Sequence, residues 1–371
     1  MKTAKKIGIV CWSLFVLLLI AILVVGIVIG PQKIFNGVSL WSGNIVINTD
    51  NAKEVSTYSV PVKDFDNINI DWESGYVKFY IYEGDEIQLI ERSRKKLDDK
   101  EKMTYKVENG TLEIESKSSF GIRFFYFGDT QKILEVKIPA DKLSEINKLC
   151  TSTASADVFV NDIDFKKIEI STASGEVSME NIKSENINID TTSGDILMSS
   201  LTVANSCSAN STSGCVSLKN SSMSDLETDT TSGDVTITSV NIKDSCSANS
   251  TSGYVSLIDC VSPSVETNTT SGDVKLDGEF SKVQCDTMSG DINISSKTVL
   301  TELSCNTTSG GITVKIPTDT EEGFTANIST VSGDFICDLP VTSNGDKKIY
   351  GNGEYRYNFD STSGNITIKT I

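Results

Sequence analysis

A short turn sequence, Ser-Gly-Asp-Val or a near variant, recurs along most of this 371-residue chain and constrains its fold more than any other feature. Successive turn glycines are separated by 18 to 20 residues. They are Gly175, Gly194, Gly214, Gly233, Gly253, Gly272, Gly290 and Gly310. A fixed period this short indicates stacked repeats in which each unit contacts mainly its neighbours. The chain is therefore expected to form a solenoid.

Apolar residues recur at fixed positions relative to each turn glycine. Before the glycine and after it, successive apolar positions are two residues apart. The residues two positions after the glycines are Val177, Ile196, Val216, Val235, Val255, Val274, Ile292 and Ile312. A third, looser apolar position follows the glycine by seven to nine residues, at Ile182, Leu201, Val240, Val261 and Val299. A spacing of two is that of a β-strand with one buried face. Helical solenoids need longer repeats and spacings of three to four residues.

The repeats therefore predict an all-β fold, a right-handed parallel β-helix with about 19–20 residues per coil. The right hand is expected by analogy with parallel crossovers, which have a strong handedness. In such a stack we expect Val235, Val255 and Val274 to be neighbours on successive coils. The turn glycines are expected to supply a positive φ, and the Ser and Thr residues beside them to form structural hydroxyl ladders.

Residues 1–30 are predicted to be a cytoplasmic stub followed by a transmembrane helix. Ile7 to Ile29 is a run of 23 residues without a charge, and as a helix it spans about 35 Å, enough for a bilayer core. Lys2, Lys5 and Lys6 precede it, which by the positive-inside rule places the rest of the chain outside the membrane. The run is longer than the apolar core of a cleavable signal peptide, so an uncleaved anchor is favoured, with cleavage left open.

Three further regions are expected after the anchor. Residues 31–148 contain apolar stretches of strand length between polar turns, which predict a β-rich N-terminal cap domain over the first coil. Residues 149–340 hold the β-helix repeats. Residues 341–371 are predicted to be a C-terminal coil and cap, in which Tyr355 to Ile371 closes the far end of the stack.

The acidic charge of the chain belongs to the repeats. Residues 1–150 hold 20 acidic and 20 basic side chains, residues 151–371 hold 30 acidic and 13 basic ones, and the net charge is −17. This disfavours nucleic acid as a partner, since phosphate contacts need clustered Lys and Arg. The chain also has no histidine, the commonest general base. We therefore predict no catalytic residues, no cofactor and no enzymatic activity.

Aspartates follow several turn glycines and raise the question of calcium. They are Asp195, Asp234, Asp273, Asp291 and Asp334. Asp273 and Asp291 fall on adjacent coils, about 5 Å apart. However, Cys215, Tyr254 and Gly311 interrupt the row, and calcium needs six to eight oxygen ligands. The row predicts no metal site, and calcium binding is left as the minor alternative.

The chain has nine cysteines, and their spacing matches neither a disulfide framework nor a zinc motif. Cys207 and Cys246 take one inward strand position, and Cys285 and Cys305 take another on neighbouring coils. We expect all four to be small buried hydrophobes. A disulfide between Cys285 and Cys305 is left open.

Several segments together resemble one bacterial family. They are DFDNINIDWESGYVKFY and LEVKIPADKLSEI before the repeats, the TTSGDI and TTSGDV turns, and STSGNITIKTI at the end. Over Asp64 to Ile371 the chain resembles the putative-adhesin family of β-strand-repeat proteins, a domain of unknown function. The resemblance implies a membrane-tethered or secreted β-helix with no catalytic residues to carry over. The chain departs from the family pattern in its cysteine content and at Ala156, which replaces a turn glycine.

These features predict a non-enzymatic, single-pass protein of the cell membrane whose extracellular β-helix serves as an adhesin or as a scaffold for envelope interactions. Its partner is expected to be an extracellular or envelope protein or a glycan. One alternative is a component or regulator of a cell-envelope stress response that acts through protein–protein contacts. A carbohydrate-active β-helix enzyme is the second alternative, and it requires clustered carboxylates that the repeat offsets do not show.

Overall fold

The computed structural model describes residues 52–117, 132–317 and 322–371. In these ranges every regular element is a β-strand, apart from two short 3-10 turns at Val62–Asp64 and Leu143–Glu145. The all-β prediction is therefore confirmed for the described residues, which belong to one compact unit, Ala52–Ile371. The expected transmembrane helix at 7–29 lies outside them. Among the described residues, no helix has both the length and the hydropathy to cross a membrane.

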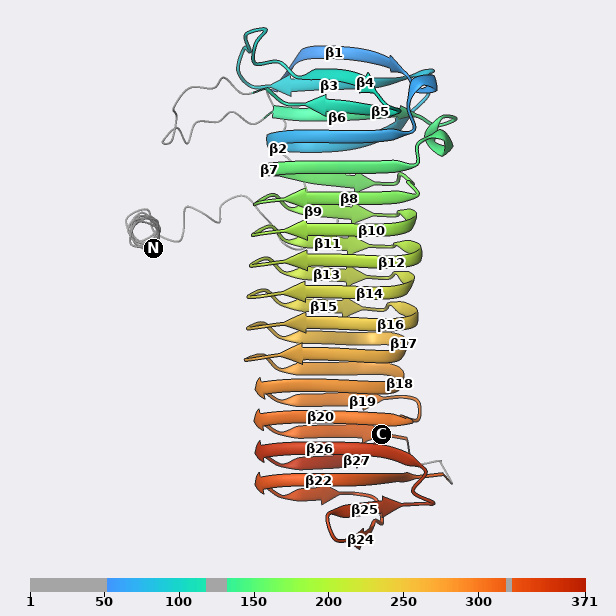
Figure 1. Ribbon diagram of the computed structural model, residues 1–371, viewed down its shortest axis with the longest axis vertical. Coiled ribbons are helices and arrows are strands. Elements are labelled where there is room, and N and C mark those ends of the chain that lie inside the picture. The colour runs from blue at the N-terminus through green and yellow to red at the C-terminus, as the bar shows by residue number, and fades with distance from the viewer. Residues whose placement is uncertain (1–51, 118–131, 318–321) are drawn as a thin grey trace, which may run out of the picture. The chain divides into compact units, whose positions relative to one another are not determined.

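Each of the first regular coils contains two strands, a longer one before the turn glycine and a shorter one after it (Figure 1). The strands before the glycine are β8 (Lys167–Thr172), β10 (Lys183–Thr191), β12 (Thr202–Ser211), β14 (Ser222–Thr230) and β16 (Asn241–Ser250). The strands after it are β9 (Val177–Glu180), β11 (Ile196–Ser199), β13 (Val216–Lys219) and β15 (Val235–Thr238). Each strand pairs in parallel with its equivalent on the next coil, which gives a β-solenoid around one core.

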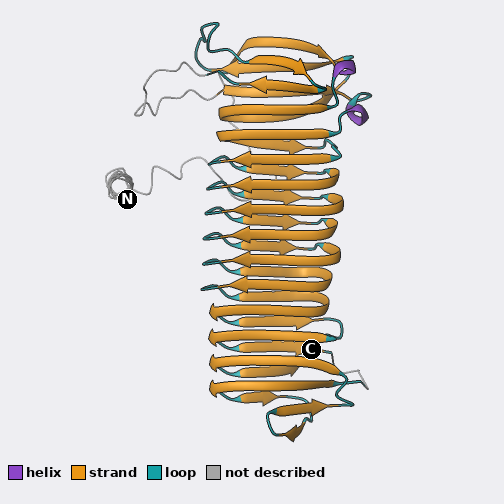
Figure 2. Ribbon diagram, in the orientation of Figure 1, coloured by secondary structure: helices purple, strands orange, loops and turns teal. Residues whose placement is uncertain are grey.

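The bend that links the strand after the turn glycine to the first strand of the next coil is called the third corner. In the later coils, strands continue around this corner. β17 (Val255–Thr269) and β18 (Val274–Ser289) each join the second strand of one coil to the first strand of the next. They are followed by β19 (Ile292–Ser296), β20 (Glu302–Ser309) and β21 (Ile312–Ile316). Along the regular coils the loops lie at the edges of the stack, and strands form its faces (Figure 2).

The aliphatic positions form continuous columns in the core, as predicted. Val235, Val255 and Val274 are register partners on successive coils, and all three are fully buried. Burying one such side chain contributes about 1.5–3 kcal/mol. Because every coil adds another set of these side chains, the core grows with the stack and needs no single centre.

A residue in the left-handed conformation makes the third corner in most coils. Asn181, Ser200, Asn220, Ser239 and Asp259 occupy this corner, with φ between 49° and 56°. Asn, Asp and Ser suit it because their short polar side chains bond nearby backbone groups. The residue after the corner points inward, as at Leu201. Two predicted core positions are therefore wrong: Val261 is 40% exposed beside the buried Cys260, and Leu300 is buried in place of Val299.

The turn glycines are required by the close approach of neighbouring coils and not by their own backbone angles. None of the eight has a positive φ, which corrects the prediction. A Cβ atom placed on Gly253 would lie 2.0 Å from the carbonyl oxygen of Gly233 on the preceding coil. The equivalent distances from Gly194 to Gly310 are 1.8 to 2.2 Å. A larger residue at these positions would therefore push the coils apart.

The N-terminal end is closed by strands that continue the same solenoid. They are β1 (Lys53–Pro61), β2 (Asn67–Tyr82), β3 (Glu86–Ser93), β4 (Thr104–Glu108), β5 (Thr111–Glu115), β6 (Lys132–Pro139) and β7 (Lys148–Asn161). β2 pairs in parallel with β7 on one side and with β5 and β6 on the other. Antiparallel β3 and β4 cover β6 and β5, and β1 covers β3. The cap thus lies over the repeats and belongs to the same compact unit as they do.

The C-terminal end has an interleaved order, so the prediction that Tyr355 to Ile371 closes the stack is wrong. Its strands are β22 (Phe324–Ser332), β23 (Phe335–Cys337), β24 (Thr342–Asn344), β25 (Lys347–Tyr350), β26 (Tyr355–Ser363) and β27 (Ile366–Thr370). β26 and β27 pair with β20 and β21 on one side and with β22 and β23 on the other. The last coil therefore lies inside the stack, and the hairpin of β24 and β25 covers β22 (Figure 1).

Candidate binding groove on the turn edge

A buried row of hydroxyl groups lies three residues before the turn glycines. Its members include Thr172, Thr191, Ser211, Thr230, Ser250, Thr269, Thr287, Thr307 and Ser361. The Ser250 hydroxyl accepts a hydrogen bond from the amide of Gly253 (2.8 Å) and donates one to the carbonyl oxygen of Gly233 on the preceding coil (2.9 Å). Ser211, Thr230 and Thr269 repeat both bonds on their own coils. This ladder is therefore structural, as predicted.

A second row, four residues before the turn glycines, lies on the outer face and mixes carboxylates with amides. In stacking order it is Asp190, Asn210, Asp229, Asn249, Asn268, Asp286, Asn306 and Asp360. Asn210 donates through Nδ2 to Asp190 (3.1 Å), and Asn249 donates to Asp229 (2.8 Å). Carboxylates on adjacent coils would lie about 4.8 Å apart and repel each other. The amides keep the carboxylates on non-adjacent coils and donate hydrogen bonds to three of the four.

A groove of about 870 Å³ runs between this Asp/Asn row and a row of threonines two residues before the glycines. The threonine row is Thr212, Thr231, Thr251, Thr270, Thr308 and Thr362, with Met288 in one place. The groove extends over eight coils from Asp190 to Asp360, about 34 Å at 4.8 Å per coil. Its described lining consists of hydroxyl, amide and carboxylate side chains and one methionine. Such a surface offers hydrogen-bond donors and acceptors along its length, and its carboxylates disfavour anions.

No groove residue was predicted as a site from the sequence. The signal was present as Asp or Asn four residues before each turn glycine, but it acquires meaning only when the coils are known to stack in register. The repeated NSTSG and NTTSG segments did predict hydroxyl ladders. The structure divides those hydroxyls into a buried row that joins the coils and an outer row that lines the groove.

The aspartates after the turn glycines link neighbouring coils. Oδ1 of Asp273 accepts a hydrogen bond from the amide of Asp291 (2.8 Å), and Oδ1 of Asp291 accepts one from the amide of Gly311 (2.7 Å). The same bond to the next coil is made by Asp195 and Asp234. Asp334 differs, since its own amide donates to Asn365 (2.9 Å). Among the residues described, no group of three or more His, Cys, Asp or Glu side chains is placed to hold a metal ion.

Toward the N-terminal end, Glu176 and Asp157 occupy the position that the aspartates after the turn glycines occupy in later coils. Oδ1 of Asp157 accepts a hydrogen bond from the amide of Glu176 (2.8 Å). Burial, reinforced by the charges of Asp157 and Asp195, raises the pKa of the Glu176 carboxyl to about 6. Burial also raises the pKa of Asp157. Glu176 therefore changes charge at a higher pH than an ordinary glutamate.

The four cysteines that the sequence placed in the core are buried, as predicted. Cys207, Cys246, Cys285 and Cys305 all have free thiols. Cys285 and Cys305 are register partners on β18 and β20, so the disulfide left open by the sequence is not formed in this structure. Burial raises the pKa of the Cys207 thiol to about 12, which keeps it protonated at neutral pH. These side chains therefore pack as small apolar groups.

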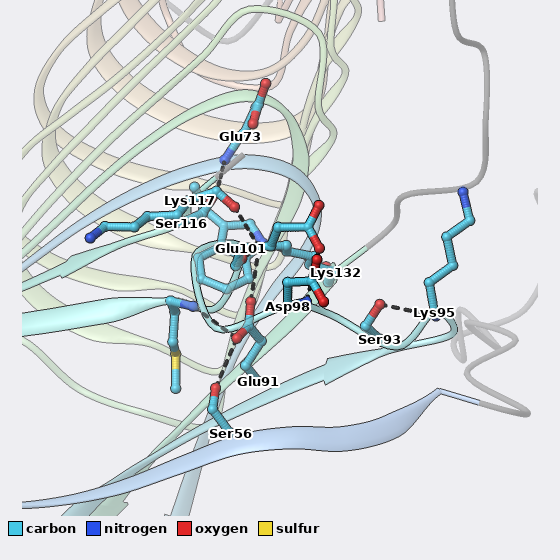
Figure 3. Close-up of polar contacts among 12 residues, drawn as sticks. Ser56, Glu73, Glu91, Ser93, Lys95, Asp98, Glu101, Ser116, Lys117 and Lys132 are labelled. Atoms are coloured by element: carbon cyan, nitrogen blue, oxygen red, sulfur yellow. Dashed lines mark hydrogen bonds and ion pairs between the residues drawn. The ribbon is translucent and has the colours of Figure 1, made fainter. Parts of the chain in front are cut away.

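A buried ion pair in the N-terminal cap is a second polar cluster, and no sequence motif pointed to it (Figure 3). Glu91 on β3 is fully buried, and its Oε1 lies 3.1 Å from Nζ of Lys132 on β6. Its Oε2 accepts hydrogen bonds from the Ser56 hydroxyl (2.8 Å) and the Met103 amide (2.9 Å). Lys132 also donates to the carbonyl oxygen of Lys117 (2.8 Å). Within the cap, the pair therefore fastens β1 and the segment before β4 to β3 and β6.

The chain matches a known protein family. The family model described as Toastrack DUF4097 matches residues 65–277 and, in a second overlapping alignment, residues 205–369. These alignments extend from the N-terminal cap through the repeats to the last coil. No curated protein matches the chain.

Several solved structures are similar to the chain. One is a "putative lipid binding protein" from Parabacteroides distasonis, with 17% identity, a TM-score of 0.38, and coverage of 86% of this chain and 98% of that one. Another is a "putative adhesin" from Bacteroides fragilis, with 13% identity, a TM-score of 0.34, and coverage of 86% and 99%. A third is a "putative cell adhesion protein" from Clostridium sporogenes, with 12% identity, a TM-score of 0.25, and coverage of 86% and 100%. At these TM-scores, none of the three carries an argument about function.

Proposed function

The chain belongs to the Toastrack DUF4097 family, and we propose that it is a non-enzymatic surface scaffold of the cell envelope, or an adhesin. The family match confirms the resemblance that the repeat motifs indicated. We further propose a right-handed coil and an N-terminal membrane anchor at residues 7–29, with the solenoid outside. In this arrangement the turn-edge groove faces ligands of the extracellular space or the envelope.

The groove is the observation that carries this proposal. Eight coils supply equivalent side chains to one continuous surface, whereas an active site gathers a few different groups around one reacting centre. A surface that repeats hydroxyl, amide and carboxylate groups suits a ligand that is itself a repeating polymer. We propose a hydroxyl-rich glycan chain as the ligand class, because the carboxylates disfavour polyanions and the lining provides both donors and acceptors.

The two alternative functions make different demands on the same surface. A role in a cell-envelope stress response requires that the solenoid or its anchor contacts another membrane protein. A carbohydrate-active enzyme requires carboxylates gathered at one point, whereas in the groove they are spread over the stack and several are bonded by Asn amides. The scaffold proposal therefore agrees best with the arrangement of the groove.

Binding to isolated cell envelopes tests the proposal. Thr251→Arg places a bulky side chain in the groove, and Asn241→Arg places the same side chain at an exposed site on the opposite corner of the same coil. We expect the groove variant to lower envelope binding of the tagged protein at least tenfold, and the control to bind like the wild type. Equal binding of both variants would exclude the groove as the contact surface.

Treating the envelopes before the binding assay separates the ligand classes. If the ligand is a glycan, as proposed, binding survives protease treatment of the envelopes and is lost after enzymatic digestion of their polysaccharides. Loss of binding after protease treatment alone would favour the alternative in which the solenoid contacts a membrane protein.

A further inference from the structure

The last coil of this chain occupies a slot between two coils that precede it in the sequence. β26 lies between β20 and β22, and β27 lies between β21 and β23. From this topology we propose that the last coil, residues 355–370, exchanges between two copies of the chain, so that each copy fills the slot of the other. The partner is thus a second copy of the same chain, and the interaction surface is the slot.

The slot fits a coil with this repeat pattern. Gly364 of the last coil stacks on Gly310, where a Cβ atom on Gly364 would lie 1.9 Å from the Gly310 carbonyl oxygen. On the other side, a Cβ atom on Gly333 would lie 2.0 Å from the carbonyl oxygen of Gly364. Only a coil with a turn glycine at this point can enter. The last coil of a second copy has the same sequence and therefore the same glycine.

An aromatic side chain anchors the last coil in the slot. Tyr357 is 2% exposed, and its ring stacks on that of Phe324 with centroids 4.6 Å apart and planes 16° apart. Its hydroxyl donates a hydrogen bond to the carbonyl oxygen of Leu300 (3.0 Å). Buried aromatic anchors of this kind dominate the stability of many protein interfaces. A coil exchanged between copies makes the same contacts with the other copy.

In the closed form the last coil fills the slot of its own chain, and in the exchanged form it fills the slot of a second copy. Apart from the new symmetry, the two forms differ only in the link between β25 and β26. In the closed form this link turns tightly through Gly351 and Gly353, whose φ angles are 60° and 71°. The Gly353 amide donates to the carbonyl oxygen of Tyr350 (3.1 Å). Exchange of an identical element through a short hinge retains the native contacts and is a low-cost route to a dimer.

The order of the chain also favours exchange. β22 and β23 precede the last coil, so during folding the slot is empty until residues 355–370 enter it. An empty slot exposes unpaired strand edges and the apolar faces of two coils. The last coil of a neighbouring copy competes with the chain's own last coil for this space.

Disulfide crosslinking between two differently labelled full-length chains tests the proposal. Asn306 on β20 and Asp360 on β26 are exposed register partners, so one chain carries Asn306→Cys and the other Asp360→Cys. Cys215, which is exposed, is replaced by serine in both. After the chains are refolded together and oxidised, we expect a disulfide-linked heterodimer. Asn249→Cys mixed with Asp360→Cys is the control and should give none, because Asn249 lies four coils away.

Strain in the hinge provides a second, matched measurement. Gly351→Ala adds left-handed strain to the hinge of the closed form, and straightening the hinge relieves it. Gly345→Ala adds the same strain in the β24–β25 turn (φ 62°), which exchange leaves unchanged. We expect the crosslinked fraction to rise severalfold with Gly351→Ala and to stay constant with Gly345→Ala. If an Asn306→Cys, Asp360→Cys double variant crosslinks within one chain while the mixed chains give no heterodimer, the proposal is overturned.

Discussion

Replacing Gly310 with alanine tests the reason for the turn glycines, and the next residue provides a matched control. A Cβ atom on Gly310 would lie 2.0 Å from the carbonyl oxygen of Gly290, whereas one on Gly311 would have its nearest neighbours at 3.6 Å. Neither glycine has a positive φ, so neither substitution adds backbone strain of its own. To accept the added methyl group of Gly310→Ala, the two coils must separate by roughly 1.5 Å at this contact, because non-bonded heavy atoms pack at about 3.5 Å.

The separation stretches the hydrogen bonds that cross this contact. They include the bond from the Thr307 hydroxyl to the Gly290 carbonyl oxygen (3.3 Å) and the bond from the Gly311 amide to Asp291 (2.7 Å). With two or three bonds lost at about 1 kcal/mol each, Gly310→Ala should lower the free energy of unfolding by about 2–3 kcal/mol. Gly311→Ala should change it by less than about 0.5 kcal/mol. Urea denaturation followed by circular dichroism measures both, and equal losses would refute this explanation.

Three further variants test the polar clusters by denaturation. Glu176→Gln should stabilise the protein by about 1 kcal/mol at pH 8 and leave its stability unchanged at pH 4. The reason is that the raised pKa of Glu176 makes the stability of the wild type fall as the pH rises from 4.5 to about 6. A difference between variant and wild type that does not change with pH would contradict this. Glu91→Gln should cost about 3–5 kcal/mol, and adding Lys132→Met should recover part of it. Asn249→Asp, beside Asp229, should cost about 1 kcal/mol at pH 7.

The stacked β-fold was predictable because it rests on a period that every coil repeats. Each aliphatic column depends only on the offset from the nearest glycine, so Val235, Val255 and Val274 could be placed side by side without knowing where the chain begins its stack. The role of the glycines themselves was misjudged, because an isolated Ser-Gly turn looks the same whether it needs a positive φ or lacks room for a Cβ atom. Only the carbonyl oxygen of the preceding coil distinguishes the two.

The ends of the stack were not predictable for the opposite reason. The turns around Gly333 and Gly364 carry the same pattern, so nothing local in the sequence says which of the two coils pairs with β20. The groove was missed for a related reason, since Asp229 and Asn249 form part of a row only when their coils are adjacent. These features depend on which coils are neighbours in the stack. A sequence pattern aligned on single residues does not contain that information.

The distance between spin labels on the groove tests the stacking most directly. Asn210 and Asn306 belong to the same outer row and are separated by five coil steps. With cysteine-attached labels at these two positions and Cys215 replaced by serine, pulsed electron paramagnetic resonance should give one narrow distance near 24 Å, at about 4.8 Å per coil. A broad distribution, or a main distance beyond about 40 Å, would contradict a solenoid whose coils stack in register to form the groove.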